Sequence, residues 1–440
     1  MTNSLPTSKI QRGKVVGKTI LKIGASKSKA IVKRTFSTKT KTIIDEEMHE
    51  DVAKSIFEAL GKLKGLSVKI AQQVALGMPF LPQTYLDQMQ KSFHQIPPIN
   101  KALVRKIIKN ELGEYPEKCF DTFENTAFGS ASLGQVHLAT FGDEKLAIKI
   151  QYPGIKKSID SDLSMLNFGL KRVAKGKDIS HLIKEVSDRI HEEVDYEIEA
   201  QNNEFFLKNF NIEGVVIPKV YKGYSTKHII TSEYIEGKTF EQLLKSKPTQ
   251  QLIDSYAQLI FDSFYHSVYK LKTIHADPNP GNFIFKDDGK IGMIDFGCVK
   301  NINDEFLKKY NKLHVTLIEG ITDEDVLEQY IELGMIDGES KEEMLTFYQE
   351  TIKPFDSMYI EVLKNGSYDF KENKDFSKRG FELVLEVQKK QFEAIHKINQ
   401  EFIFLDRTLL GYYGMFERIG AKIDTTNAVK IMKKYRSENA

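Results

Sequence analysis

Three polar side chains between residues 275 and 297 have the types and the spacing that phosphoryl transfer requires. Asp277 and Asn282 belong to the run His275–Asn282, and Asp295 follows in Asp295–Gly297. An asparagine and an aspartate supply two oxygen ligands for Mg²⁺, which neutralises phosphate charge, while a second aspartate orients or deprotonates the acceptor. The residues between Asp277 and Asn282 are ordinary turn formers, so an inert loop is the alternative for this run taken alone.

A glycine-rich segment earlier in the chain has the pattern of a loop that binds nucleotide phosphates. Its glycines allow backbone N–H groups to approach phosphate oxygens with no side chain between them. Alanine replaces the middle glycine of the usual pattern, and a hairpin turn is the alternative for this segment by itself. The predicted nucleotide-binding residues of the segment are Gly129, Ala131, Ser132, Gly134, Gln135 and Val136.

Lys149 ends the apolar run Leu146–Lys149, which is typical of a strand whose lysine reaches the α- and β-phosphates of ATP. An exposed lysine of an edge strand is the alternative, because alternation places Lys149 on the face opposite its neighbour. A phosphate-binding lysine needs a carboxylate partner on a helix. Residue spacing alone does not choose among Glu193, Glu197 and Glu199.

The elements that must position these residues are short strands followed by helices. The signatures stand in the order that they have in protein kinases. We therefore predict an α+β, protein-kinase-like two-lobed fold, with a small lobe built on a mixed antiparallel sheet, a mainly helical lobe and an N-terminal helical extension. The predicted strands are 122–127, 133–141, 144–152, 215–221, 227–234 and 291–294. The predicted helices are 46–77, 83–95, 101–112, 158–173 and 179–209, followed by the almost wholly helical region 301–440.

Four regions follow from these elements: a basic arm at 1–44, the helical extension at 45–118, the small lobe at 119–236 and the helical lobe at 237–440. An apolar and aromatic stripe in the last region predicts a helix in the core of the lobe. A lipid-lined pocket and a dimer face are the alternatives for the stripe. Its members are Phe402, Leu405, Leu409, Tyr412, Tyr413 and Phe416.

Charge is distributed unevenly along the chain. The 440 residues carry a net charge of +2, but the first 44 contain eleven Lys and Arg residues and no acid, so the rest carries −9. A basic arm predicts an anionic partner, which is a membrane surface or, less specifically, nucleic acid. Residues 8–24 have the approximately helical apolar spacing of a membrane-bound amphipathic helix, and a solvated arm is the alternative.

Several classes of protein are excluded by composition. Cys119 and Cys298 are too few for a disulfide scaffold. No apolar run reaches the roughly 18 residues of a membrane-spanning helix, and lysines interrupt the apolar core that a secretory signal would need. The acid-poor start is also compatible with an organellar transit peptide.

The chain resembles the ABC1/UbiB family of atypical kinases, also called the AarF family, from about residue 5 to its C-terminus. It departs from the family in the nucleotide loop, where Gly129 and Ser130 replace two alanines. This departure leaves the preference for nucleotide open. The stretches that carry the resemblance are 5–9, 69–72, 131–137, 148–154, 193–200, 275–282 and 295–297.

This resemblance implies a role for each matching residue. Asp277 is the implied catalytic-loop aspartate, and Lys149 with Glu199 is the implied phosphate-binding pair. Lys69 and Gln72 belong to a helix that covers the active site in the family, although Ala71 replaces the family's glycine there. The other implied site residues are Glu193 and Asp195, which form an E-x-D pair, and Asn282 and Asp295, which bind Mg²⁺.

The same resemblance implies an ATP- and Mg²⁺-dependent atypical kinase or ATPase that supports the synthesis of ubiquinone or another isoprenoid quinone or lipid. The implied partners are ATP, a lipid or isoprenoid-quinone precursor, an anionic membrane surface and quinone-biosynthesis enzymes. We expect no nucleic-acid partner, and a homodimer stays open. The expected location is the cytoplasmic face of a membrane, with a mitochondrial location as the alternative. Two other functions stay open: a protein kinase that acts on partner proteins, and a nucleotide-binding pseudokinase scaffold.

Overall fold

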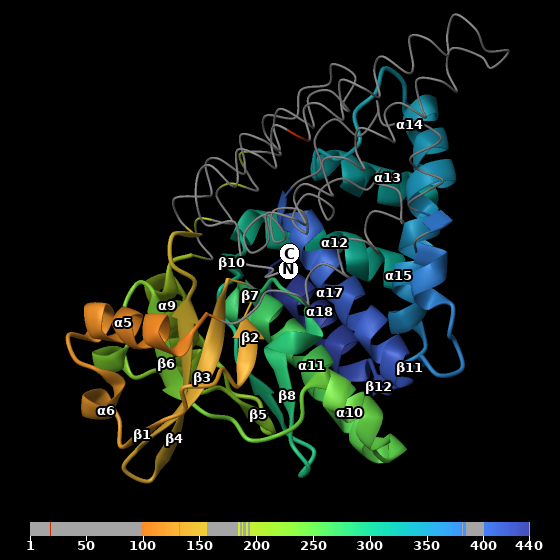
Figure 1. Cartoon of the computed structure of the whole chain (residues 1–440). Coiled ribbons are helices and arrows are strands. Elements are labelled where there is room, and N and C mark those ends of the chain that lie inside the picture. Colours follow the sequence, from red (N-terminus) through yellow and green to blue (C-terminus); the bar gives the residue numbers. More distant parts are fainter. Residues whose placement is uncertain are drawn as a thin grey trace, which may run out of the picture. The chain divides into compact units, whose positions relative to one another are not determined.

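The computed structural model describes residues 99–131, 133–155, 194–380, 382–383 and 400–439, together with Lys18, Lys184, Ser187 and His191 (Figure 1). The chain divides into two compact units. The first unit runs to Ala200 and includes Val220–Tyr234, whereas the second contains Gln201–Lys219 and Ile235 onward. Lys69, Gln72, Ser132 and Glu193 lie outside the described residues, as does the basic arm apart from Lys18.

An antiparallel sheet of five strands forms the centre of the first unit. The strand order is β1-β3-β4-β6, and β2 pairs with β3. Leu146, Ile148 and Ile150 alternate along β4 and are fully buried on one face of the sheet. The strand bounds are Thr122–Phe123 for β1, Gly129–Ala131 for β2, Gly134–Phe141 for β3, Glu144–Gln151 for β4 and Ile229–Glu233 for β6.

Helix α5 (Lys101–Leu112) packs against the buried face of this sheet through Val104 and Ile108 (Figure 1). Its N-terminus is capped by Asn100, whose side chain accepts a hydrogen bond from the backbone N–H of Leu103. Its C-terminus is closed by Gly113 at a φ of 85°, a conformation that glycine adopts without strain. The helix predicted at 101–112 is therefore confirmed, and a short helix, α6 (Pro116–Cys119), leads from it to β1.

The strands predicted near 215–221 and 227–234 agree with the structure to different extents. The second is present as β6 in the first unit. The first is divided. Its start forms β5 (Val215–Val216), which pairs in parallel with β9 (Ile291–Met293) of the second unit, in a small sheet of order β5-β9-β8. Its end belongs to the first unit, where Val220 bridges Ser232 of β6. The predicted pairing within the sheet of the first unit is therefore present at Val220 but not at β5. An apolar run indicates a strand but not its partner, because pairing is set by the tertiary structure.

Helix α9 (Tyr196–Asn209) occupies only the end of the region predicted to be helical at 179–209. Val194 is in a turn, and the carboxylate of Asp195 accepts a hydrogen bond from the backbone N–H of Glu197 at 3.3 Å. An aspartate in this position satisfies an N–H group that has no partner within the helix. The continuous helix predicted across residue 195 is therefore wrong at that point.

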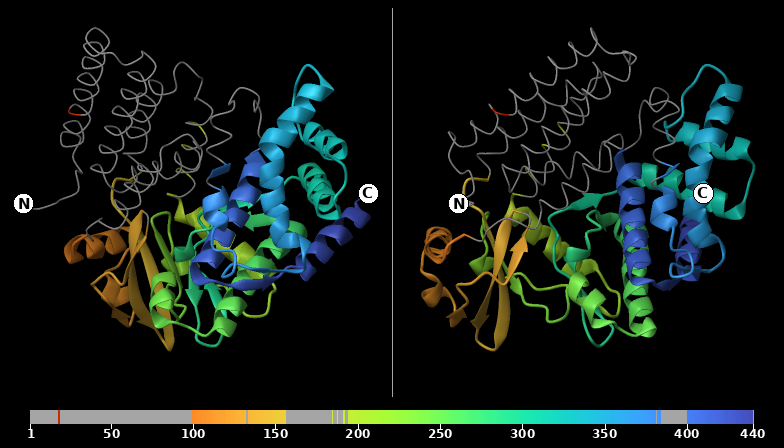
Figure 2. Two further views of the ribbon diagram at one scale, coloured as in Figure 1. Left: turned by 90° about the vertical axis from the view of Figure 1, so that its right-hand side faces the viewer. Right: turned by 45° about the vertical axis from the view of Figure 1, so that its right-hand side comes forward.

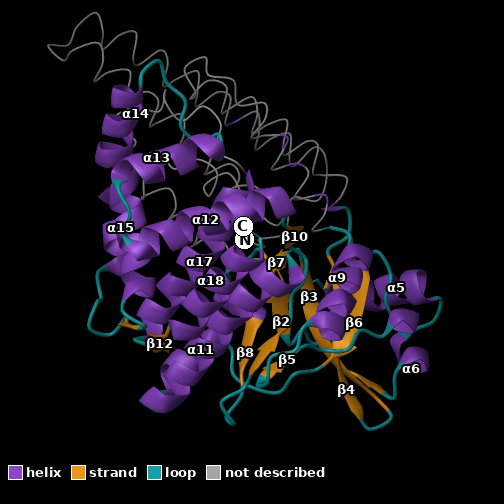
Figure 3. Cartoon of the chain, turned by 180° about the vertical axis from the view of Figure 1, so that it is seen from behind, coloured by secondary structure: helices purple, strands orange, loops and turns teal. Residues whose placement is uncertain are grey.

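Helices make up most of the second unit, as predicted (Figure 3). The short strands β11 (Ser367–Asp369) and β12 (Lys422–Asp424), which form an antiparallel pair, were not predicted. The helices are α10 (Phe240–Ser246), α11 (Gln250–His266), α12 (Asp304–Glu319), α13 (Asp323–Glu332), α14 (Lys341–Phe347), α15 (Lys353–Lys364), α17 (Gln400–Ile419) and α18 (Thr426–Glu438).

The aromatic stripe lies on α17, which runs alongside α11 (Figure 2). Leu405, Leu409, Tyr413 and Phe416 are fully buried in the core of the second unit. The prediction that the stripe is part of the core is therefore confirmed. Within the described residues, no helix is long and apolar enough to cross a membrane.

Candidate active site

Lys149 and Glu199 form an ion pair in the first unit. The Lys149 Nζ atom donates to both carboxylate oxygens of Glu199, at 2.8 and 2.9 Å. Glu199 is only 4% exposed, and the Lys149 ammonium also lies 5.0 Å from the centre of the Tyr196 ring. Strand β4 supplies the lysine, and the first turns of α9 supply the glutamate and the tyrosine. Of the three glutamates that the sequence left open, the structure brings Glu199 to Lys149.

The face of the sheet that carries Lys149 is half-exposed, and apolar side chains lie beside the lysine. Val136 lies directly opposite Lys149, and Leu138 lies directly opposite Ala147. Side chains directly opposite each other in an antiparallel pair project from the same face. Around Lys149 this face therefore combines small and branched apolar side chains with a cation, which is the kind of surface that a flat base and its phosphates need.

Gln135 lies on the other face of β3. It is 1% exposed, its amide oxygen accepts the backbone N–H of Ile99 at 2.8 Å, and its Nε2 lies 2.7 Å from Nε2 of His137. Burial lowers the pKa of His137. The Gln135 side chain, which the loop pattern assigns to the nucleotide, thus bonds the chain just before α5 instead.

The two described glycines of the nucleotide loop have different surroundings. A Cβ atom on Gly134 would lie 2.3 Å from the carbonyl oxygen of Ile150, so the close approach of β3 to β4 requires glycine there. A Cβ atom on Gly129 would have no neighbour within 4 Å. Gly129 is therefore not required by packing, and the space around it is open to a ligand.

Asp195 pairs with the ammonium of Lys227 besides capping α9. The hydrogen bond and the charge of Asp195 raise the pKa of Lys227. The E-x-D pair itself is not described, because Glu193 lies outside the described residues. These two contacts of Asp195, with the start of α9 and with Lys227, stabilise the first unit.

The second unit carries the loop that contains Asp277. The Asp277 carboxylate accepts the backbone N–H of Asn279 at 3.3 Å, and the Asn279 side chain accepts the backbone N–H of Gly281 at 2.9 Å. The Nδ2 atom of Asn282 donates to the Asp277 carbonyl oxygen at 3.1 Å. Successive side-chain bonds to the backbone thus set the shape of this loop, between β7 (Thr273–His275) and β8 (Phe283–Phe285).

Asp295 follows β9 and lies near this loop. The backbone N–H of Ile294 donates to the carbonyl oxygen of Asn282 at 3.0 Å, which joins the two segments. The Asp295 carboxylate accepts the backbone N–H of Gly297 at 3.0 Å, and His275 Nε2 is hydrogen-bonded to the Asp295 carbonyl oxygen. Phe296 is buried against the rings of Phe206 and His275.

The donor set fits Mg²⁺. Because Asn282 donates through Nδ2, its amide oxygen is directed away from that bond and can serve as a ligand, as can the carboxylate of Asp295. Within the part of the chain that the structure describes, no group of three or more His, Cys, Asp or Glu could hold a metal. A pair of oxygen ligands matches a cation that takes its remaining ligands from phosphates and water.

Sequence reasoning missed two features of the site. The Tyr196 ring lies beside the Lys149 ammonium, and the spacing of Tyr196 and Glu199 on one helix was a usable signal. Helix α17 packs against the Asp277 loop, because a Cβ atom on Gly411 would lie 2.4 Å from Cγ of Pro278. No local pattern could reveal that contact between segments more than 100 residues apart.

Residues 91–329 match the family model described as the ABC1 atypical kinase-like domain. This match covers more than half of the chain and defines a kinase-like protein. The chain is a member of the ABC1 atypical kinase family. It is 26% identical over 454 residues to Atypical kinase COQ8, mitochondrial, of Saccharomyces cerevisiae, covering 99% of this chain and 87% of that protein.

Two other relatives differ in coverage. The chain is 25% identical over 453 residues to the probable serine/threonine-protein kinase abkA of Dictyostelium discoideum, covering 96% of this chain and 79% of that protein. It is 29% identical over 299 residues to ACTIVITY OF BC1 COMPLEX KINASE 8, chloroplastic, of Arabidopsis thaliana. That match covers 65% of this chain but only 39% of the plant protein.

Among solved structures, the chain is similar to that of Rv3197 from Mycobacterium tuberculosis in complex with erythromycin. The TM-score is 0.63 at 23% identity, and the match covers 88% of this chain and 97% of the other. This similarity supports the predicted α+β, kinase-like fold.

Proposed function

We propose that this protein binds ATP with Mg²⁺ and transfers the γ-phosphate to water or to a small acceptor. The observation that carries the proposal is the ion pair between Lys149 and Glu199, with both contacts below 3 Å. A lysine held by two oxygens of a nearly buried carboxylate is oriented in advance for phosphate oxygens. Removing both charges from water is costly, so such a pair is weak evidence for stability alone and better evidence for a binding role.

Each remaining site residue then has a chemical task. Asn282 and Asp295 would hold Mg²⁺, which when bound neutralises charge on the phosphates. Asp277 would position the acceptor and take its proton. The half-exposed apolar side chains of Val136, Leu138 and Ala147 would lie against the base.

For the acceptor we propose a lipid or an isoprenoid-quinone precursor, with an anionic membrane surface and quinone-biosynthesis enzymes as partners. Family membership and the similarity to the yeast protein named Atypical kinase COQ8, mitochondrial, support this step. The basic first 44 residues support attachment to a membrane surface. Two of the relatives are named as chloroplastic and mitochondrial proteins. The proposed location is therefore the cytoplasmic face of a membrane, with a mitochondrial membrane as the alternative.

ATP hydrolysis with and without anionic liposomes and phenolic quinone precursors tests the proposal. We expect phosphate release that depends on Mg²⁺, rises with liposomes, and is lost in Lys149→Met and Asp295→Asn. Lys145→Met is the matched control, because Lys145 is exposed on the same strand and should behave as the wild type. Equal phosphate release by the wild type and Lys149→Met would show that the activity does not use this site.

A second candidate is a protein kinase that acts on other proteins. The similarity to a Dictyostelium protein named as a probable serine/threonine-protein kinase favours it. Incubation with ATP and candidate proteins separates the two functions. Efficient transfer to a protein, with little phosphate release stimulated by lipid, would replace the first proposal by the second.

A further inference from the structure

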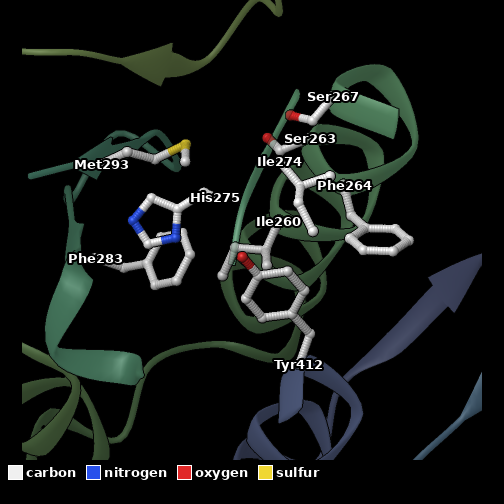
Figure 4. Close-up of a pocket in the computed structure, with 9 residues that line it drawn as sticks. All are labelled: Ile260, Ser263, Phe264, Ser267, Ile274, His275, Phe283, Met293 and Tyr412. Carbon is white, nitrogen blue, oxygen red and sulfur yellow. The ribbon is translucent and has the colours of Figure 1, made fainter. Parts of the chain in front are cut away.

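A small pocket lies inside the second unit, next to the Asp277 loop (Figure 4). It has about 10 Å³ of room, which is close to the space that one water molecule needs. Its polar lining comes from His275, Tyr412, Ser263 and Ser267, and the rest is apolar. In Figure 4 the Tyr412 hydroxyl and the His275 ring face the same space.

The protonation of His275 can be assigned from its partners. Nε2 is hydrogen-bonded to the carbonyl oxygen of Asp295, and a carbonyl oxygen only accepts, so Nε2 carries a proton. In a neutral imidazole the other nitrogen, Nδ1, is then an acceptor. This atom is buried and has no hydrogen-bond partner among the described residues, and the residue as a whole is 4% exposed. A buried acceptor in this position requires a donor.

The pocket lining contains a suitable donor. The Ser263 hydroxyl already donates to the carbonyl oxygen of Leu259 at 2.6 Å. Tyr412 is 3% exposed, and burial, followed by the negative charge of Asp277, raises its pKa. The Tyr412 hydroxyl therefore keeps its proton at neutral pH and can donate it in a hydrogen bond.

The position of Tyr412 is set by α17. Its ring packs edge-on against Phe283 and Phe264, with centroid distances of 5.9 and 6.3 Å. The preceding residue, Gly411, has no room for a side chain because Pro278 of the Asp277 loop packs against it. Tyr412 is thus held rigidly beside the loop, although it is 130 residues away from Asn282 in the sequence.

We propose that Tyr412 is a positioning residue for Asp295, and that it acts through one water molecule in this pocket and through His275. The Tyr412 hydroxyl donates to the water, and the water donates to Nδ1 of His275. This arrangement keeps the proton on Nε2, where it holds the backbone of Asp295. The effect on metal binding rests on the proposed function, whereas the water and the protonation of His275 do not.

Tyr412→Phe tests the proposal, and Tyr413→Phe is the matched control. Tyr413 is the adjacent tyrosine on the same helix and is equally buried, but it packs against Phe370 and Phe376 instead of lining the pocket. We expect Tyr412→Phe to raise the Mg²⁺ concentration for half-maximal ATP hydrolysis about 3- to 10-fold, as loss of one hydrogen bond predicts, with a smaller change in kcat. Tyr413→Phe should leave this concentration unchanged.

Two measurements do not depend on activity. The ¹⁵N NMR spectrum of the imidazoles, with His275 assigned from a His275→Gln variant, should show a protonated Nε2 and an unprotonated Nδ1 in the wild type. In Tyr412→Phe the Nδ1 signal should shift, and a high-resolution crystal structure of the wild type should contain the water.

Several outcomes would overturn the inference. A protonated Nδ1 in the wild type or an empty pocket at high resolution would refute the relay itself. Equal Mg²⁺ dependence in Tyr412→Phe and Tyr413→Phe would refute the positioning role. If the wild type released no phosphate, the proposed function would fail, but the NMR and crystallographic results would still decide whether the relay exists.

Discussion

Carboxylates that are largely removed from water have different hydrogen-bond partners in the two units. In the first unit, Glu199 is nearly buried and faces the ammonium of Lys149. In the second unit, Asp356 is buried and accepts the hydroxyl of Tyr330 at 2.6 Å, and the half-buried Asp406 accepts the hydroxyl of Tyr310 at 2.7 Å. One carboxylate is thus compensated by a cation, whereas the other two have neutral donors.

The neutral partners leave the two aspartates with raised pKa values. Burial raises the pKa of Asp356 to about 7 and that of Asp406 to about 7, because the tyrosine hydroxyls compensate only part of the lost hydration. A lysine stabilises the ionised form far more than a hydroxyl does. The first unit thus places a cation beside its carboxylate, which the proposed function uses for phosphate, while tyrosine and aspartate together form a polar part of the core of the second unit.

The largest expected effect comes from breaking the charged pair. Lys149→Met leaves the Glu199 charge buried without its lysine, so we expect a loss of about 3 to 5 kcal/mol in the free energy of unfolding. ATP hydrolysis should fall about 100-fold or more. Urea unfolding and phosphate-release assays measure the two effects.

The double variant Lys149→Met/Glu199→Gln separates stability from function. It removes both charges, so it should recover most of the stability but none of the activity. If the single variant were as stable as the wild type, the pair would not be a buried one in solution, and the comparison with Asp356 would fail.

The buried aspartates give the next largest effect, which depends on pH. The folded protein keeps a proton on Asp356 up to about pH 7, whereas the unfolded chain releases it near pH 4. The unfolded state then binds fewer protons, so stability should fall as pH rises from about 4 to about 7, by about 2 to 4 kcal/mol, and then level off. Asp356→Asn should flatten this dependence in urea unfolding at several pH values. An unchanged pH dependence in the variant would assign the effect to other groups.

The glycines beside the charged pair test whether strand packing positions it. Gly134→Ala forces a methyl group against the Ile150 carbonyl oxygen, so we expect a loss of about 1 to 3 kcal/mol in the free energy of unfolding. Gly129→Ala is the control, since its methyl group meets no neighbour and should change stability by less than about 0.5 kcal/mol. Similar losses in both variants, measured by thermal unfolding, would contradict the packing of β3 against β4.

The smallest effect is expected at a surface pair. Arg436 donates to both carboxylate oxygens of Glu319 at 2.8 Å, but about a third of each side chain is exposed. Arg436→Met should therefore cost about 0.5 kcal/mol, and the loss should shrink further in high salt. A cost near that of Lys149→Met would show that burial does not distinguish the two pairs.

Much of the fold could be predicted because its signals are local. The helix at 101–112 follows from its apolar spacing and from the residues that cap it, Asn100 and Gly113. The β3–β4 hairpin follows from two alternating runs separated by Gly142-Asp143. The pairing of β5 with β9 was not predicted, because the chain has no local signal for it.

Some residues of the candidate site could be predicted from motifs, whereas others could not. The motifs identified Lys149, Asp277, Asn282 and Asp295, but spacing alone did not select Glu199 as the lysine's partner, for which the family resemblance was needed. Gln135 matches the pattern of the nucleotide loop, but its side chain lies on the buried face of the sheet and accepts a hydrogen bond from Ile99. A motif specifies residue types, whereas the face on which each one lies depends on the strand register.

By itself, the sequence determined the order of the strands and helices, the identity of the site motifs and the uneven charge of the chain, because these depend on neighbouring residues. Only the tertiary structure decided which glutamate meets Lys149, which sheet receives β5, and that Tyr412 shares a pocket with His275. These contacts join segments from 50 to more than 130 residues apart. Local propensity contains no information about them, since they form only when distant apolar surfaces are buried together.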